Sequence, residues 1–129
     1  TPAGRIGMTI CYDLRFPHLY RQLARAGAEI MAIPAAFTVP TGRAHWETLM
    51  RARAIETGSY VLAPAQGGVH EAGRSTGGRS LFIDPWGVIV AGLDHDEPGV
   101  AIADLDLDLV QETRAKMPAW GFDAEYAGP

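Results

Sequence analysis

Cysteine and lysine are almost absent from this sequence of 129 residues, which has one copy of each, Cys11 and Lys116. A single cysteine excludes an internal disulfide framework and favours a reducing compartment, so we expect a cytoplasmic protein. The longest apolar run, residues 30–37, is far shorter than the roughly 18 residues that cross a bilayer, and no N-terminal signal is visible. The sequence therefore predicts a soluble protein with no membrane partner.

Positive charge is also scarce. The chain has 11 basic and 15 acidic residues, a formal net charge of -4, and its arginines are scattered. This balance argues against nucleic acid as a partner. No pair of metal-ligating side chains is backed by a second pair, and the glycine-rich stretch 67–78 lacks the lysine and the following helix of a P-loop. We therefore expect no metal and no cofactor.

The residues that are present describe an ordinary folded domain. Hydrophobic residues make up 47% of the chain and charged residues 20%, and the length suits one domain. We expect residues 1–118 to form that domain and residues 119–129, which lack periodicity, to form a C-terminal tail.

Hydrophobic periodicity and turn signals predict alternating strands and helices. The expected elements are strands at 5–10, 28–35 and 60–65, helices at 16–26 and 43–56, loops at 38–42 and 67–78, a hairpin of 80–83 and 88–91 around an Asp-Pro-Trp-Gly turn, a strand at 99–104 and a helix at 106–117. This order is typical of an α/β fold. Two helices cover only one face of such a sheet, so the other face needs a partner.

Cys11 stands where the first predicted strand turns into the first predicted helix. A lone cysteine is most often a small buried hydrophobe. At the C-terminal end of a strand, however, a side chain lies at the sheet edge where α/β proteins bind ligands, and a helix N-terminus favours a thiolate. Cys11 is therefore a candidate nucleophile.

A cysteine nucleophile needs a base, and the four histidines are the obvious candidates. His18 and His45 fall in predicted helices, whereas His70 and His95 fall in polar loops. Their neighbours single out none of them. A hydrolase that pairs Cys11 with one of these histidines stays open as an alternative.

Several motifs occur together in one order along nearly the whole chain: GRIGMTICYDLRFP, AGAEI, PAAF, HWETLMRARAIET, YVLAPAQ and DPWG. With them the chain resembles the C-terminal half of a carbon-nitrogen hydrolase of the nitrilase superfamily, and is most similar to the Nit subgroup of deaminated-glutathione amidases and ω-amidases. The resemblance implies the C-terminal half of a four-layer αββα sandwich. It also implies hydrolysis of an amide of a small carboxylic acid through a cysteine thioester.

The resemblance assigns roles to individual residues. Cys11 matches the family nucleophile, and Tyr12 would supply the backbone amide that binds the oxyanion. Ala36, Phe37 and Thr38 match the loop that lines the acyl pocket, and so are expected to bind substrate. In the family a glutamate acts as general base and a lysine also holds the oxyanion.

That glutamate and that lysine precede the cysteine strand in the family, whereas this sequence begins directly before it. Lys116, Glu47 and Glu56 fall in predicted helices and match neither residue. We therefore expect an amidase whose N-terminal half is missing here, and a chain that is inactive alone. The alternative is a naturally truncated, non-catalytic subunit or interaction module of the same fold.

The resemblance also implies a homodimer or larger homo-oligomer, joined through the helices at 16–26 and 43–56. Tyr20, Arg21, Arg51 and Arg53 on these helices are an aromatic and arginine mixture that is enriched at interfaces. We expect these four side chains at the subunit contact.

Overall fold

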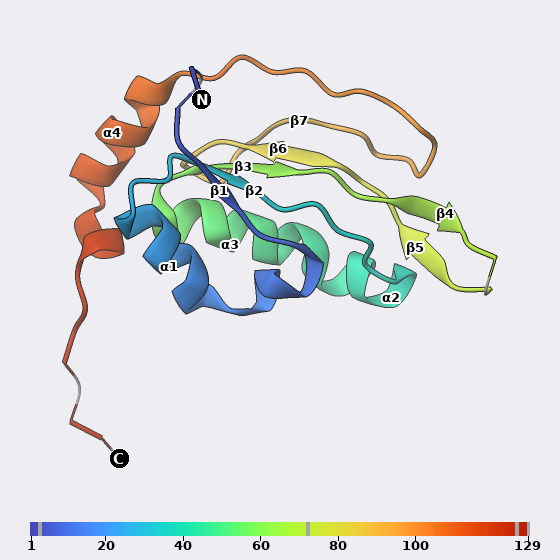
Figure 1. Cartoon of the computed structure of the whole chain (residues 1–129), viewed down its shortest axis with the longest axis horizontal. Coiled ribbons are helices and arrows are strands. Elements are labelled where there is room, and N and C mark those ends of the chain that lie inside the picture. The colour runs from blue at the N-terminus through green and yellow to red at the C-terminus, as the bar shows by residue number, and fades with distance from the viewer. Residues whose placement is uncertain (3, 72, 126, 129) are drawn as a thin grey trace.

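A five-stranded sheet forms the centre of the computed structural model, which describes residues 1–2, 4–71, 73–125 and 127–128 (Figure 1). Its strands lie in the order β1-β2-β3-β6-β7. Their bounds are β1 (Ile6–Met8), β2 (Ile30–Ala32), β3 (Tyr60–Ala63), β6 (Leu81–Ile83) and β7 (Ile89–Gly92). The first three are parallel and the last two antiparallel.

Two helices, α1 (Pro17–Arg25) and α3 (Glu47–Thr57), cover the inner face of this sheet (Figure 1). Strand register places Met31, Val61 and Ile83 in one row on that face, and none of the three is exposed to solvent. The helices end where the sequence predicts. Gly58, which follows α3, has a φ of +56°, a left-handed conformation that glycine adopts without strain.

The second helical region begins earlier than predicted. A short helix, α2 (Val39–Thr41), and a π-helical turn, Gly42–Trp46, lead directly into α3. The prediction of a loop at 38–42 was wrong. Proline suits the first turn of a helix, because the backbone N–H that it lacks would have no acceptor within the helix at that position. Pro40 occupies such a first-turn position.

The hairpin around the Asp-Pro-Trp-Gly turn is confirmed as β6 and β7. The Asp84 side chain accepts hydrogen bonds from the amides of Trp86 and Val88, at 2.8 and 2.9 Å, which fixes the turn locally. The glycine-rich stretch is not a plain loop. It forms a separate two-stranded ribbon of β4 (Gly67–Val69) and β5 (Ser75–Gly77).

The strand predicted at 99–104 is wrong. Residues 101–106 are extended without strand pairing, and Val100 and Ile102 are 83% and 86% exposed. Alternating apolar residues suit a strand only where a neighbouring strand offers hydrogen bonds. Among the described residues, none pairs with this segment.

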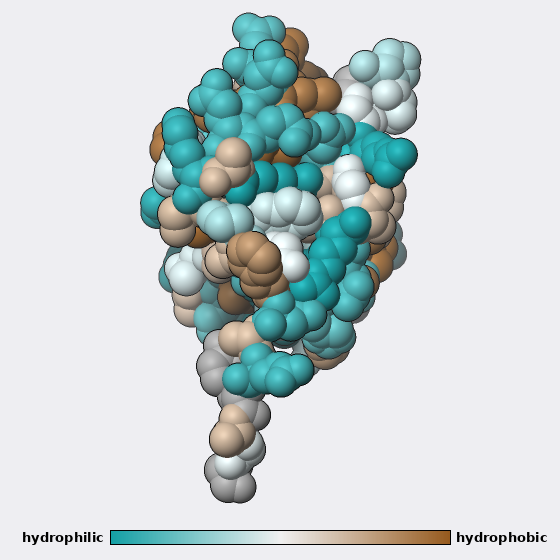
Figure 2. Space-filling view, turned by 90° about the vertical axis from the view of Figure 1, so that its left-hand side faces the viewer, coloured by the Kyte–Doolittle hydropathy of each residue, from teal (hydrophilic) through white to brown (hydrophobic). Residues whose placement is uncertain are grey.

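The closing helix is confirmed as α4 (Leu107–Lys116), capped by the Asp106 side chain, which accepts a bond from the Asp108 amide. The face of the molecule around α4 is mostly hydrophilic (Figure 2). A 3-10 turn, Pro118–Gly121, follows.

The beginning of the predicted tail is fastened to α1. Arg21 donates to the carbonyl oxygen of Ala119, and Arg25 pairs with Asp123 at 2.7 Å. Positions 126 and 129 of the tail lie outside the described residues.

The outer face of the sheet is apolar and only partly covered. Register aligns Met8 with Ala32 and Leu62 across three strands, and Met8 and Ile10 are 68% and 65% exposed. Helix α4 packs over one end, around Tyr60. The α/β class is confirmed. The five-stranded sheet and the helices on its inner face correspond to one sheet layer and one helix layer of the expected αββα sandwich.

Two of the residues expected at a subunit contact lie inside the chain instead. Tyr20 is fully buried and Arg53 is 5% exposed, because α1 and α3 pack against each other. Arg21 and Arg51 remain partly exposed.

Candidate active site

Cys11 follows the C-terminal end of β1, which is Met8, and begins a 3-10 helix, Cys11–Arg15. Its φ is +47°, in the left-handed region that non-glycine residues rarely occupy. This conformation costs about 1–2 kcal/mol for an L-residue, so the surrounding contacts must hold it. Such strain is typical of functional sites.

Hydrogen bonds hold the chain on both sides of Cys11. The Cys11 amide donates to the carbonyl oxygen of Pro34 at 2.8 Å. Ile10 and Asp13 form a reciprocal pair across the turn: the Ile10 amide donates to Asp13 Oδ2, and the Asp13 amide donates to the Ile10 carbonyl. The strained turn is therefore fixed by its own backbone and by the segment after β2.

A cavity of about 660 Å³ opens beside Cys11. Its lining residues are Ile10, Cys11, Pro34, Ala35, Ala36, Pro64, Ala65, Gln66, Gly67, Ser80, Leu93, His95, Asp96, Glu97, Pro98 and Gly99. The carboxyl ends of the parallel strands β1, β2 and β3 meet at this edge, which is where α/β sheets bind ligands. Cys11 thus lies where the sequence predicts a reactive side chain.

Tyr12 follows Cys11 in the first turn of the 3-10 helix, where backbone N–H groups have no acceptor within the helix. Its side chain is 66% exposed and lies beneath the Arg15 guanidinium, 5.5 Å from the ring centroid. The Tyr12 amide is therefore a suitable type of donor for an oxyanion formed at Cys11.

The three residues predicted to line the acyl pocket are placed differently from one another. Ala36 lines the cavity. Phe37 is buried against Trp46 with ring centroids 5.2 Å apart, and Thr38 bonds to Thr41 through their hydroxyl groups. Neither Phe37 nor Thr38 is among the lining residues.

Sequence reasoning missed the loop at 93–99, which forms one wall of the cavity. Asp96 lies so close to Gly67 that a Cβ on this glycine would meet the Asp96 Cα at 2.7 Å. The polar composition of the loop was visible, but its position was not, because the segment was predicted to continue into a strand.

The histidines and the single lysine lie in different parts of the fold. Among the four histidines, His95 lines the cavity, whereas His70 bonds to Thr76 and His45 lies beside Arg15. Lys116 lies on α4, 3.7 Å from a Glu112 oxygen, as its sequence position predicts.

Two glutamates of the predicted helices each form an ion pair with an arginine. Glu47 pairs with Arg79, and Glu56 pairs with Arg53. Within the described ranges, no three metal-ligating side chains are grouped closely enough to hold a metal ion. In the same ranges, no helix has the length and apolarity that a bilayer span requires.

Comparisons with known proteins show the family of the chain. The family model described as carbon-nitrogen hydrolase matches residues 1–115. A deaminated glutathione amidase from Synechocystis is 51% identical over 116 residues, which cover 90% of this chain and 42% of that protein. The chain therefore spans less than half the length of this curated relative.

Two solved structures are similar to the whole fold. The C. elegans NitFhit protein superposes with a TM-score of 0.88 at 44% identity, covering 95% of this chain and 30% of that one. An amidase mutant from Nesterenkonia sp. AN1, with acrylamide added at its active site cysteine, superposes with a TM-score of 0.70 at 32% identity. That match covers 89% of this chain and 44% of the amidase. By family match, sequence and fold, the chain belongs to the carbon-nitrogen hydrolases of the nitrilase superfamily.

Proposed function

We propose that the complete protein hydrolyses the carbon-nitrogen bond of a small amide through acylation of Cys11. The observation that carries this proposal is the strained, left-handed Cys11 at the carboxyl edge of the sheet, beside a cavity large enough for a small molecule. The adduct at the active site cysteine of the Nesterenkonia amidase supports the same role.

The reaction has two steps. The Cys11 thiolate attacks the amide carbonyl carbon, and the oxygen takes up negative charge. The carbon-nitrogen bond then breaks as the nitrogen takes up the proton that the base removed from the Cys11 thiol, which releases ammonia or an amine and leaves a thioester. Water then hydrolyses the thioester to a carboxylate and restores the thiol. The Tyr12 amide binds the oxyanion, and Ala36, which lines the cavity, shapes its acyl side together with the residues that follow it in the chain, Phe37 and Thr38.

The step that moves protons needs a base, and the oxyanion needs a further cation. In this proposal a glutamate and a lysine from an N-terminal half supply both. Two observations support that half: the Synechocystis relative extends well beyond the matched region, and the outer sheet face leaves Met8 and Ile10 exposed. Alone, residues 1–129 are expected to be inactive.

The name of one relative supports a substrate class. The Synechocystis relative is named a deaminated glutathione amidase, so we propose an ω-amide of a small carboxylic acid. No cofactor or metal enters this reaction. We further propose a cytoplasmic homodimer or larger homo-oligomer with residues 1–118 in the hydrolase domain and 119–129 as its tail.

The test uses the complete gene product and Cys11→Ala. Wild type should release ammonia from a short ω-amide, and mass spectrometry of a trapped intermediate should place the acyl group on Cys11. Acylation elsewhere, or turnover that survives Cys11→Ala, would contradict the proposal. Light scattering at micromolar concentration tests the oligomer, which a strictly monomeric mass would exclude.

A second mechanism has one observation in its favour, because His95 lines the same cavity as Cys11. If His95 were the base, residues 1–129 alone would hydrolyse the amide and His95→Ala would abolish that activity. If no form of the protein turns over an amide, the non-catalytic subunit is the better description.

A further inference from the structure

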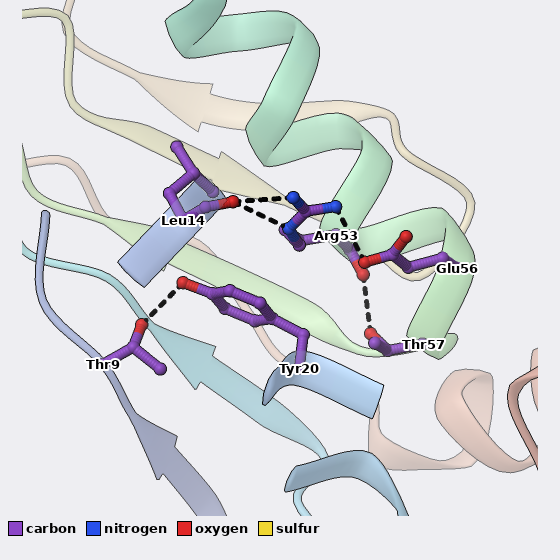
Figure 3. Close-up of polar contacts among 6 residues, drawn as sticks. All are labelled: Thr9, Leu14, Tyr20, Arg53, Glu56 and Thr57. Carbon is purple, nitrogen blue, oxygen red and sulfur yellow. Dashed lines mark hydrogen bonds and ion pairs between the residues drawn. The ribbon is translucent and has the colours of Figure 1, made fainter. Parts of the chain in front are cut away.

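A buried arginine on α3, Arg53, forms hydrogen bonds to the turn that contains Cys11. Arg53 donates two hydrogen bonds to the carbonyl oxygen of Leu14, from Nε at 2.9 Å and from Nη2 at 2.7 Å (Figure 3). Leu14 lies three residues after Cys11 in the same 3-10 helix and is fully buried. The contact joins residues that are 39 positions apart in the sequence.

Arg53 is itself held from two directions. Its Nη1 donates to Glu56 at 2.9 Å, and its backbone carbonyl accepts from the Thr57 hydroxyl at 2.7 Å (Figure 3). The guanidinium is planar and its donors form a fixed fork, so the bond to Glu56 sets its orientation, whereas the Thr57 bond holds only the helix backbone. The bond to Glu56 therefore restricts how the guanidinium can turn away from Leu14.

The chain segment before Cys11 is connected to Arg53 through Tyr20. The Arg53 guanidinium lies 5.3 Å from the ring centroid of Tyr20, and the Tyr20 hydroxyl shares a 2.8 Å hydrogen bond with the Thr9 hydroxyl. Thr9 is buried and lies two residues before Cys11. Contacts from Arg53 and Tyr20, which are both buried, thus reach the chain on both sides of Cys11.

Resting on the proposed function of Cys11, we propose that Arg53, with Tyr20, is a positioning residue that holds the nucleophile turn in its left-handed conformation. A residue in that conformation persists only where its surroundings impose it. An arginine that bonds a carbonyl near the end of the 3-10 helix also balances the negative end of its dipole. The arrangement uses no contact with substrate, because Arg53 is buried and absent from the cavity lining.

The experiment compares Arg53→Lys with Arg51→Lys in the complete gene product. Lysine at position 53 keeps the positive charge beside Glu56 but cannot reproduce the two-pronged bond to Leu14. Arg51 lies on the same helix, is about half exposed and bonds to Gly87, so it controls for the substitution itself. Tyr20→Phe removes only the bond to Thr9.

Displacing a nucleophile slightly lowers the rate of the chemical step without weakening substrate binding. Arg53→Lys should reduce kcat about tenfold to 100-fold with KM nearly unchanged. The rate of Cys11 alkylation by iodoacetamide, followed by peptide mass spectrometry, should fall as well. Arg51→Lys should change neither, and Tyr20→Phe should lower kcat by a smaller factor.

A purely structural role gives a different result. If Arg53→Lys lowers Tm while kcat per folded molecule and the alkylation rate match wild type, the positioning role is overturned. If Arg53→Lys does not accumulate as folded protein, Tyr20→Phe decides: a lower kcat supports the proposal and an unchanged kcat overturns it. Activity that survives Cys11→Ala overturns the proposed function, whereas an inactive Cys11→Ala with an unaffected Arg53→Lys overturns only the positioning role.

Discussion

Arg114 on α4 donates a 2.6 Å hydrogen bond from Nη2 to the carbonyl oxygen of Ala28, which lies 86 residues earlier, just before β2. The same side chain bonds to the carbonyl of Thr57 and the hydroxyl of Ser59, and its guanidinium lies over the Trp120 ring. It is 8% exposed, and burial lowers its pKa. Arg114 thus fastens the last helix to the start of two central strands.

Replacing Arg114 with methionine should destabilise the protein by about 2–3 kcal/mol, because it leaves buried carbonyl oxygens without donors. Urea unfolding of the complete gene product measures this. Lys116→Met is the matched control, since Lys116 is exposed and its pair with Glu112 is worth little. Equal effects of the two substitutions would contradict the anchoring role.

Cys11→Gly and Cys11→Ala should differ in stability although we expect both to be inactive. Alanine keeps the cost of the left-handed conformation and glycine does not, so the glycine variant should unfold with a free energy about 1 kcal/mol higher than that of the alanine variant. Paired urea titrations check the difference. A more stable alanine variant would mean that the turn relaxes once the thiol is removed.

We expect Gly67→Ala to open the wall of the cavity beside Cys11. The new Cβ would overlap the backbone of Asp96 and push the loop at 93–99 outward, so KM for the amide should rise more than kcat falls. Steady-state kinetics measures both constants. Gly42→Ala is the control, because its nearest neighbour would be 3.8 Å away and its φ is -61°. A normal KM in the Gly67 variant would exclude this loop from substrate binding.

The stability of the protein should respond to the protonation of Glu56. Burial raises the pKa of this carboxyl, although the attraction of Arg53 opposes the change. The folded state therefore binds this proton more tightly than the unfolded state. The stability that the protonated Glu56 carboxyl contributes is fully present below the pKa of this group in the unfolded state. It is lost as the pH rises through the pKa of the group in the folded state.

Glu56→Gln removes this dependence. As the pH rises above about 4, the ordinary carboxyl pKa, the variant should gain stability relative to wild type, which chemical denaturation at several pH values measures. Glu112→Gln, which replaces an exposed carboxylate on α4, provides the control. A stability difference between Glu56→Gln and wild type that is constant across this range would rule out the assigned cause.

Local signals in the sequence were sufficient for the features that depend on local contacts. The turn between β6 and β7 was predictable because Asp84 bonds to amides within four residues of itself. The placement of Cys11 followed from the end of an apolar strand beside a helix with proline in its first turn. Both depend on chemistry that neighbouring residues carry.

Features that depend on distant partners were not predictable in the same way. Tyr20 and Arg53 suggested an interface by residue type, yet they contact Thr9 and Leu14 inside the chain. The alternation at 99–104 indicated a strand but contained no information about a neighbour to pair with. The wall formed by Asp96 depends on how a loop returns to β4, which no local pattern encodes.

The apolar outer face of the sheet has a consequence for the fate of newly made protein. Exposed apolar side chains such as those of Met8 and Ile10 are the kind of surface that chaperones bind and that leads unassembled chains to proteases. While that face stays uncovered, chaperones and proteases can act on the folded polypeptide as well as on its unfolded form. Coverage of the face would then raise the abundance of the protein.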